Sequence, residues 1–156
     1  MKRMRPLPLA AAAVAGAFLA SACDRGPPDG SVRVADAWVR LPASPALPGA
    51  AYFRMEAGSE GTRLTGLSTP SARWVELHET RTEKGVARMR QKKEFEFPYR
   101  GELRFEPGGN HAMLFGFDRK LKPGDRVSLT FAFNVAPPVT VEAEVRGVGG
   151  EDDGRH

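Results

Sequence analysis

Two histidines and two methionines form two compact pairs in this 156-residue sequence. His78 precedes Met89 by eleven positions, and a single residue separates His111 from Met113. Imidazole nitrogens and thioether sulfurs are borderline and soft ligands, and thioethers select Cu(I) over hard ions. Two nitrogens with two sulfurs suit a tetrahedral d¹⁰ ion. The four residues therefore predict a Cu(I) site.

The other common metal centres fit this sequence poorly. Zinc prefers thiolate, imidazole and carboxylate ligands, and Ca²⁺ and Mg²⁺ prefer oxygen. An iron–sulfur cluster needs several cysteines, and a blue-copper centre needs a cysteine thiolate. The sequence has one cysteine, Cys23, which lies next to an apolar leader. We therefore expect Cu(I) held by neutral ligands that can release it. A third methionine, Met55, has no partner in this pattern and is assigned to the core.

The first pair of ligands flanks a predicted β-hairpin. Residues 73–81 and 86–91 are predicted strands around Thr82-Glu83-Lys84-Gly85. A two-residue turn at Glu83-Lys84 would place His78 directly opposite Met89. A turn at Lys84-Gly85 would instead place His78 opposite Gln91, with Met89 diagonal on the same face. Either register brings the histidine and the methionine to one face of the hairpin.

The second pair follows a glycine-rich turn. His111 and Met113 are two residues apart in a predicted strand, so their side chains share a face. Pro107-Gly108-Gly109-Asn110 precedes them directly, which places them near one end of the sheet. A site at that end would be accessible from solvent.

The remaining sequence predicts a single all-β domain. Short runs rich in Val, Phe, Leu and Thr are separated by Gly, Pro and Asp, and no helical period is sustained. Alternation is clear in 126–135, where Val127, Leu129, Phe131 and Phe133 share a face. Many short strands without helical crossovers indicate an antiparallel sandwich or a Greek-key barrel. The predicted strands are 32–40, 50–57, 62–67, 73–81, 86–91, 102–105, 111–117, 126–135 and 139–146.

The N-terminal residues are typical of an exported protein. A basic start and an uncharged apolar run predict a signal peptide over 1–22. Leu19-Ala20-Ser21-Ala22-Cys23 resembles a lipobox, with its leucine one position further from the cysteine than usual. Lipid attachment at Cys23 would follow, and Asp24 resembles an inner-membrane retention signal. We predict a linker over 23–31, the β-domain over 32–146 and a flexible tail over 147–156.

The charge balance excludes one class of partner. Without Lys2, Arg3 and Arg5 the chain keeps 20 Lys and Arg against 19 Asp and Glu. A nearly neutral chain with interspersed charges lacks the electrostatic footprint of a nucleic-acid-binding protein. The charges at Arg88, Arg90 and Lys92-Lys93 could dock an acidic partner, and a solvated edge strand is the simpler interpretation.

The spacing of the four ligands resembles a known signature. His78, Met89, His111 and Met113 match the H-x₁₀-M-x₂₁-H-x-M motif of the PCu(A)C family of periplasmic copper chaperones. The flanking stretches are also similar across about 32–146. They include Ala51-Tyr52-Phe53, Val75-Glu76-Leu77-His78-Glu79-Thr80, Gly85-Val86, Met89-Arg90, Pro107-Gly108-Gly109-Asn110-His111-Ala112-Met113-Leu114 and Leu121-Lys122-Pro123-Gly124-Asp125.

This resemblance implies a cupredoxin-like β-barrel with a surface Cu(I) site. It also implies delivery of copper to respiratory oxidase assembly, chiefly the Cu(A) centre of cytochrome c oxidase. The expected partner is an oxidase subunit or another assembly chaperone. The protein itself is expected to be a monomer in the periplasm. Some family members add a His- and Met-rich tail for Cu(II). Here the tail offers only His156, which we assign no role.

Two alternatives share the same residues. A periplasmic copper store or sensor would use the same site without a dedicated acceptor, and sequence does not separate storage from delivery. An enzyme is the second alternative, but the sequence contains no G-x-S-x-G or H-E-x-x-H motif. His78 could pair with a carboxylate, and Glu76 shares its face along a strand whereas Glu79 does not. A copper oxidase would need mostly histidine ligands, so we expect no enzymatic activity.

Overall fold

The computed structural model describes residues 26–58, 61–98 and 101–149, and their regular secondary structure is entirely β-strand. The leader, Cys23 and His156 lie outside these residues. The strands are β1 (Val32–Arg40), β2 (Gly49–Ala57), β3 (Arg63–Ser68), β4 (Trp74–Glu83), β5 (Val86–Gln91), β6 (Phe95–Glu96), β7 (Glu102–Phe105), β8 (His111–Phe115), β9 (Arg126–Phe133) and β10 (Val139–Arg146).

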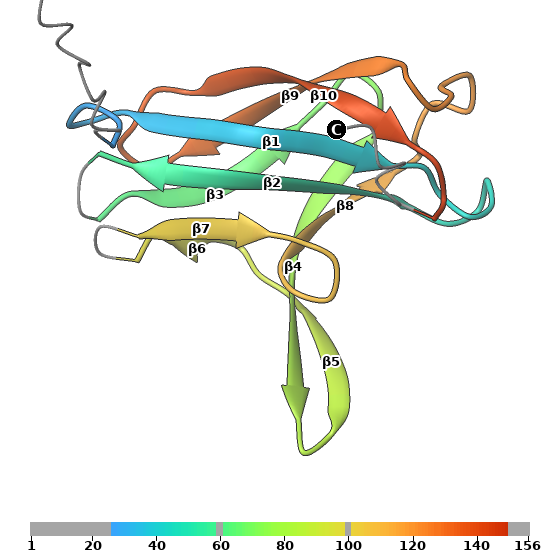
Figure 1. The fold of residues 1–156 in the computed structure, drawn as a ribbon, viewed down its shortest axis with the longest axis horizontal. Helices are drawn as coiled ribbons and strands as arrows, with labels where there is room; N and C mark the ends of the chain where they lie inside the picture. The colour runs from blue at the N-terminus through green and yellow to red at the C-terminus, as the bar shows by residue number, and fades with distance from the viewer. Residues whose placement is uncertain (1–25, 59–60, 99–100, 150–156) are drawn as a thin grey trace, which may run out of the picture.

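The strands form one sheet in the order β5-β4-β8-β2-β1-β10-β9-β3-β6, and β7 also pairs with β2 (Figure 1). The expected all-β architecture is thus confirmed. The pairings are antiparallel except between β1 and β10, which run parallel with Trp38 opposite Glu144. The predicted antiparallel pairing therefore holds except at this one junction. The last strand returns to lie beside the first, so the two ends of the domain meet in the middle of the sheet.

The core lies against one face of every strand except β5. In β9, Val127, Leu129 and Phe131 are buried, as the alternation predicts. The rings of Phe131 and Phe53 form a T-shaped pair, and Phe53 stacks on Phe105 of β7. Aromatic pairs in these geometries add stability beyond the area that they bury. These contacts connect β2, β7 and β9 in one core.

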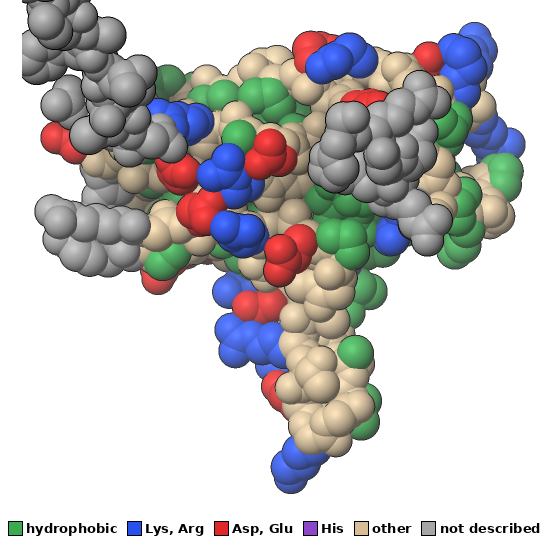
Figure 2. Space-filling view, in the orientation of Figure 1, with side chains coloured by type: hydrophobic (Ala, Val, Ile, Leu, Met, Phe, Trp, Pro, Cys, Tyr) green, Lys and Arg blue, Asp and Glu red, His purple; other side chains and the backbone are tan. Residues whose placement is uncertain are grey.

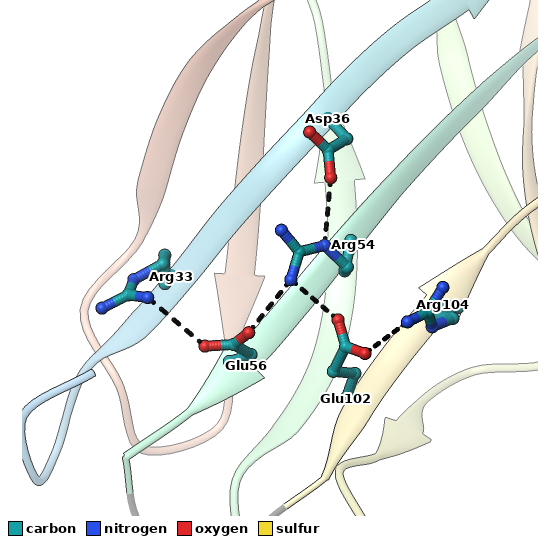
Figure 3. Close-up of polar contacts among 6 residues, drawn as sticks. All are labelled: Arg33, Asp36, Arg54, Glu56, Glu102 and Arg104. Carbon is teal, nitrogen blue, oxygen red and sulfur yellow. Dashed lines mark hydrogen bonds and ion pairs between the residues drawn. The ribbon is translucent and has the colours of Figure 1, made fainter. Parts of the chain in front are cut away.

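An ion-pair network ties β7 to the neighbouring strands on the outside of the sheet (Figure 3). The Arg54 guanidinium donates to Asp36 in β1 at 3.0 Å, to Glu56 in β2 at 3.1 Å and to Glu102 in β7 at 2.9 Å. Arg104 also donates to Glu102. The hydrogen bonds from Arg54 and then Arg104 hold the pKa of Glu102 below its ordinary value. The contacts with Glu102 and Asp36 raise the pKa of Arg54.

The end of β4 and all of β5 extend beyond the rest of the sheet as a two-stranded hairpin (Figure 1). We call residues 79–93 the arm, and the rest of the sheet the sheet body, or the body for short. Its turn is Lys84-Gly85, where both residues have positive φ, at 51° and 79°. This is the pattern of a type I′ turn, which favours glycine at its second position. The turn sets Thr80 opposite Met89 and His78 opposite Gln91. The second predicted register is therefore confirmed, and the first, with His78 opposite Met89, is wrong.

Candidate metal centre

The two predicted ligand pairs meet because β4 and β8 are antiparallel neighbours. His78 lies directly opposite His111, and Glu76 lies opposite Met113. Alternate residues of a strand share a face, so both histidines and Met113 project from the same side of the sheet. The two imidazole rings are stacked, with centroids 5.7 Å apart. Segments separated by more than thirty residues in the sequence thus contribute to one surface.

The fourth predicted ligand, Met89, reaches this surface from the arm. Its sulfur lies 3.2 Å from Nε2 of His111. Met89 is diagonal to His78 across the hairpin, as the Lys84-Gly85 turn requires. Its side chain is 54% exposed, whereas His78 is 8% exposed. The candidate centre therefore has a buried side formed by β4 and an open side formed by the arm.

The hydrogen bond of His111 defines which nitrogen is free. Its Nδ1 lies 3.0 Å from the carbonyl oxygen of Gly109. A carbonyl oxygen only accepts, so Nδ1 carries the proton and neutral His111 presents a lone pair at Nε2. That lone pair faces the Met89 sulfur, which has no proton to donate. Two electron-pair donors that converge in this way are suited to a cation placed between them.

The turn before β8 fixes the ring of His111. The Gly109 carbonyl oxygen also accepts the backbone N–H of Thr80 in β4, with a distance of 3.3 Å. The same carbonyl therefore connects the turn, the base of the arm and the histidine ring. Ligating histidines commonly donate their second nitrogen to a carbonyl, which orients the ring toward the metal.

His78 has a different partner. Its Nε2 lies 3.0 Å from a carboxylate oxygen of Glu76, which shares its face of β4. A carboxylate accepts, so in this contact Nε2 carries the proton and Nδ1 keeps the lone pair. That Nδ1 is buried and has no hydrogen-bond partner among the described residues. Alternation along the strand already places Glu76 on the histidine face, but it gives no indication of this hydrogen bond.

Met113 and an aromatic pair complete the surface. Met113 is half-buried between Glu76 of β4 and Ala50 of β2, its neighbours in the two flanking strands. Beyond it, Trp74 stacks on Phe115 with the rings 5.0 Å apart and nearly parallel, and Trp74 is 51% exposed. The candidate centre therefore lies between an exposed aromatic stack and the arm.

The donor set of this surface is soft. Within residues 26–58, 61–98 and 101–149, no group of three or more His, Cys, Asp and Glu is arranged to hold a metal ion. Met55 takes no part, because it is fully buried in the core.

Solved structures of the same architecture place this protein in a defined class. The copper-bound PCuAC domain from PmoF2 superposes with a TM-score of 0.62 at 21% identity, covering 79% of this chain and 98% of that domain. Cu(I)-bound DR1885 from Deinococcus radiodurans gives a TM-score of 0.60 at 29% identity, covering 80% and 83%. The chain thus has the cupredoxin-like all-β fold of PCuAC domains, and the resemblance seen in the sequence is confirmed.

The sequence family is also defined. Residues 32–145 match the family described as "Putative lipoprotein LpqE-like", and the chain belongs to this family. One relative is "Putative lipoprotein Lxx21020" of Leifsonia xyli subsp. xyli, 31% identical over 136 residues, which are 86% of this chain and 81% of the relative. In the part of the chain that the structure describes, no helix has the length and apolarity needed to cross a bilayer.

Proposed function

We propose that the protein binds one Cu(I) ion and delivers it to respiratory oxidase assembly, at the Cu(A) centre of cytochrome c oxidase. The proposed ligands are His78, Met89, His111 and Met113. The observation that carries the proposal is the approach of the Met89 sulfur to Nε2 of His111, at 3.2 Å. Thioether and imidazole donors select Cu(I), and a site of neutral ligands can release the ion to a stronger one.

The unequal exposure of the ligands suggests the order of exchange. Met89 lies on the exposed arm, so an acceptor ligand can displace its sulfur first. His111 and Met113 are half-buried, and His78 is the most buried of the four. His78 offers Nδ1 in its present tautomer and Nε2 once Glu76 is displaced. Copper would stay Cu(I) throughout, since each step replaces one neutral donor by another.

Relatives support both the cargo and the location. The PmoF2 domain and DR1885 have each been solved with copper bound. The LpqE-like family and its Leifsonia relative are described as lipoproteins, which supports export, cleavage after residue 22 and lipid attachment at Cys23. In this proposal residues 32–146 are the copper domain and the linker 23–31 joins it to the membrane.

An anaerobic titration with Cu(I) against a chromophoric chelator tests the site. We expect one tightly bound ion in the wild type. Met89→Leu removes a sulfur from an exposed side chain, and His78→Leu removes an imidazole. Loss of a second-sphere partner typically weakens metal affinity about 10- to 100-fold. Each of these variants loses a direct ligand, so its Cu(I) affinity should fall at least as much. Met55→Leu is the matched control, because it removes a buried sulfur and should leave Cu(I) affinity unchanged.

A transfer assay tests delivery. The copper-loaded protein is mixed with the apo form of the soluble Cu(A) domain of the same organism's oxidase, and copper on each protein is measured after separation. Transfer to the oxidase domain supports delivery. Copper retained on this protein, despite normal affinity in the titration, would favour storage. Equal binding by wild type, Met89→Leu and His78→Leu would refute the site itself.

A further inference from the structure

The positive charge of this domain is concentrated in the arm. Residues 79–93 contain six Lys and Arg against two Glu. The whole of 32–146 contains eighteen Lys and Arg against fourteen Asp and Glu, so outside the arm the two signs balance at twelve each. The segment that protrudes from the sheet, and that carries a proposed copper ligand, therefore holds the entire net charge of +4 (Figure 1).

The two faces of the arm differ in charge. Cross-strand partners share a face, so Met89 lies with Thr80, and the adjacent pairs on that face are uncharged. Figure 2 shows the Lys and Arg side chains gathered along one edge of the arm. Cationic Cu(I) bound near Met89 would thus be separated from the guanidinium groups by the backbone of the hairpin. The other face carries the charged residues of the hairpin: Glu79, Arg81, Glu83, Arg88 and Arg90.

The arginines remain largely open to solvent despite internal ion pairs. Arg81 lies 2.9 Å from Glu79 and its side chain is 66% exposed. Arg88 and Arg90 share one partner, Glu83, at 3.7 Å each, and are 61% and 67% exposed. Two carboxylates cannot neutralise three guanidinium groups together with Lys84 at the turn. An excess of accessible positive charge is left along the arm.

We propose that the arm docks an acidic surface of the copper acceptor, a protein, and that its arginines steer the encounter. The inference rests on the proposed function, since it names how the acceptor of that same site is recognised. Charges at the margin of an interface raise association rates and make them sensitive to salt. An acceptor drawn to the arm arrives beside Met89, the most exposed of the proposed ligands.

Two other partners fit the arm less well. The start of β1 and the tip of the arm lie at different extremities of the molecule (Figure 1). A tether from Cys23 to Val32 spans nine residues, which reach at most about 30 Å, so an anchored molecule would hold β1 rather than the arm nearest the lipid. A second copy of this chain would bring two positive arms together, which repel each other.

Stopped-flow transfer of Cu(I) from the exported protein to the apo Cu(A) domain tests the inference across ionic strengths. The arm variant combines Arg81→Gln, Arg88→Gln and Arg90→Gln. The matched control combines Arg119→Gln, Lys120→Gln and Arg126→Gln, exposed residues outside the arm that remove the same charge. At low salt we expect the second-order rate to fall about 10-fold for the arm variant and less than about 2-fold for the control.

Affinity, salt dependence and vesicle binding complete the test. Cu(I) affinity of the arm variant should equal that of the wild type, because no proposed ligand is changed, and the salt dependence of its transfer rate should flatten. Equal losses in both variants, or none in either, would overturn the inference while delivery stands. The absence of transfer from the wild type would overturn delivery and docking together. Arm-dependent binding to phosphatidylglycerol but not phosphatidylcholine vesicles, with transfer unaffected, would assign the arm to lipid instead.

Discussion

The sheet body and the arm are built from the same antiparallel pairing, yet they bury their side chains very differently. In the body, β9 places Val127, Leu129 and Phe131 in the core. In the arm, all six residues of β5 are exposed, and β5 pairs only with β4. An isolated two-stranded hairpin is marginally stable in water. The arm is therefore ordered by its base and its turn, whereas the body is held by its core.

This difference assigns stability mainly to the body and the opening of the candidate site to the arm. Regions with few buried apolar contacts open at a lower free energy than the core does. The body carries His78 and His111 on strands that the core fixes, and the arm brings Met89 to them. A site shared in this way can hold an ion on its buried side and open on its exposed side. Changing one region and following the other tests whether the two are separate.

The largest expected effect is on the core. Phe131→Ala empties a fully buried position and should lower the free energy of unfolding by about 3–5 kcal/mol. Val86→Ala, at a position 56% exposed in the arm, should change it by no more than about 0.5 kcal/mol. Urea unfolding followed by tryptophan fluorescence measures both. Similar losses in the two variants would mean that the arm belongs to the cooperative core.

The arm itself is tested at its turn. Gly85 has φ of 79°, and a left-handed conformation costs other L-residues about 1–2 kcal/mol. Gly85→Ala should therefore fray the arm and weaken Cu(I) binding up to about 10-fold, since Met89 would be held less often. Lys84→Asn should act in the opposite direction, because asparagine favours the first position of a type I′ turn. Chelator competition and amide hydrogen exchange of the arm measure these effects.

Unfolding of the body is the internal control for these turn variants. Its urea midpoint should be the same for Gly85→Ala, Lys84→Asn and the wild type. A common shift in copper affinity and global stability would show that the arm and the body are one unit. Unchanged Cu(I) affinity in a visibly frayed arm would argue against Met89 as a ligand.

Much of the strand layout could be predicted from the sequence. The bounds of β1, β7 and β10 agree with the predicted 32–40, 102–105 and 139–146, because a Gly or Pro lies within two residues of each end. Those of β5 agree with the predicted 86–91, which begins directly after Gly85. β6 was missed, since its two residues are too short to show alternation. The parallel pairing of β1 with β10 was also missed, because pairing between distant strands leaves no local pattern.

The way in which the four candidate ligands come together was only partly predictable from the sequence. Spacing places His111 and Met113 on one face, and the turn chemistry of Lys84-Gly85 selects the observed hairpin register. The alternation of a strand shows which side chains share a face but not whether another layer covers that face. The protrusion of the arm and the hydrogen bond between His78 and Glu76 therefore became visible only in three dimensions.

The smallest predicted effect lies in the ion network of the body. Hydrogen bonds from Arg54 and Arg104 hold the pKa of Glu102 below its ordinary value in the folded state. A carboxyl with a lowered folded pKa stabilises the protein above its unfolded pKa, and that contribution is lost as the pH falls through the folded pKa. Glu102→Gln should lower Tm slightly at neutral pH, and the difference from the wild type should shrink on acidification below the ordinary carboxyl range.

Glu96→Gln provides the comparison for this effect. Its carboxylate is 78% exposed and lies 3.9 Å from Arg63, so its removal should leave the pH profile of Tm unchanged. Scanning calorimetry from neutral to acidic pH measures all three proteins. A Tm difference for Glu102→Gln that persists in acid would mean that packing, rather than the charge on Glu102, holds β7 in place. Copper affinity should be the same in all three proteins, because the network stabilises the body and lies apart from the arm and the proposed ligands.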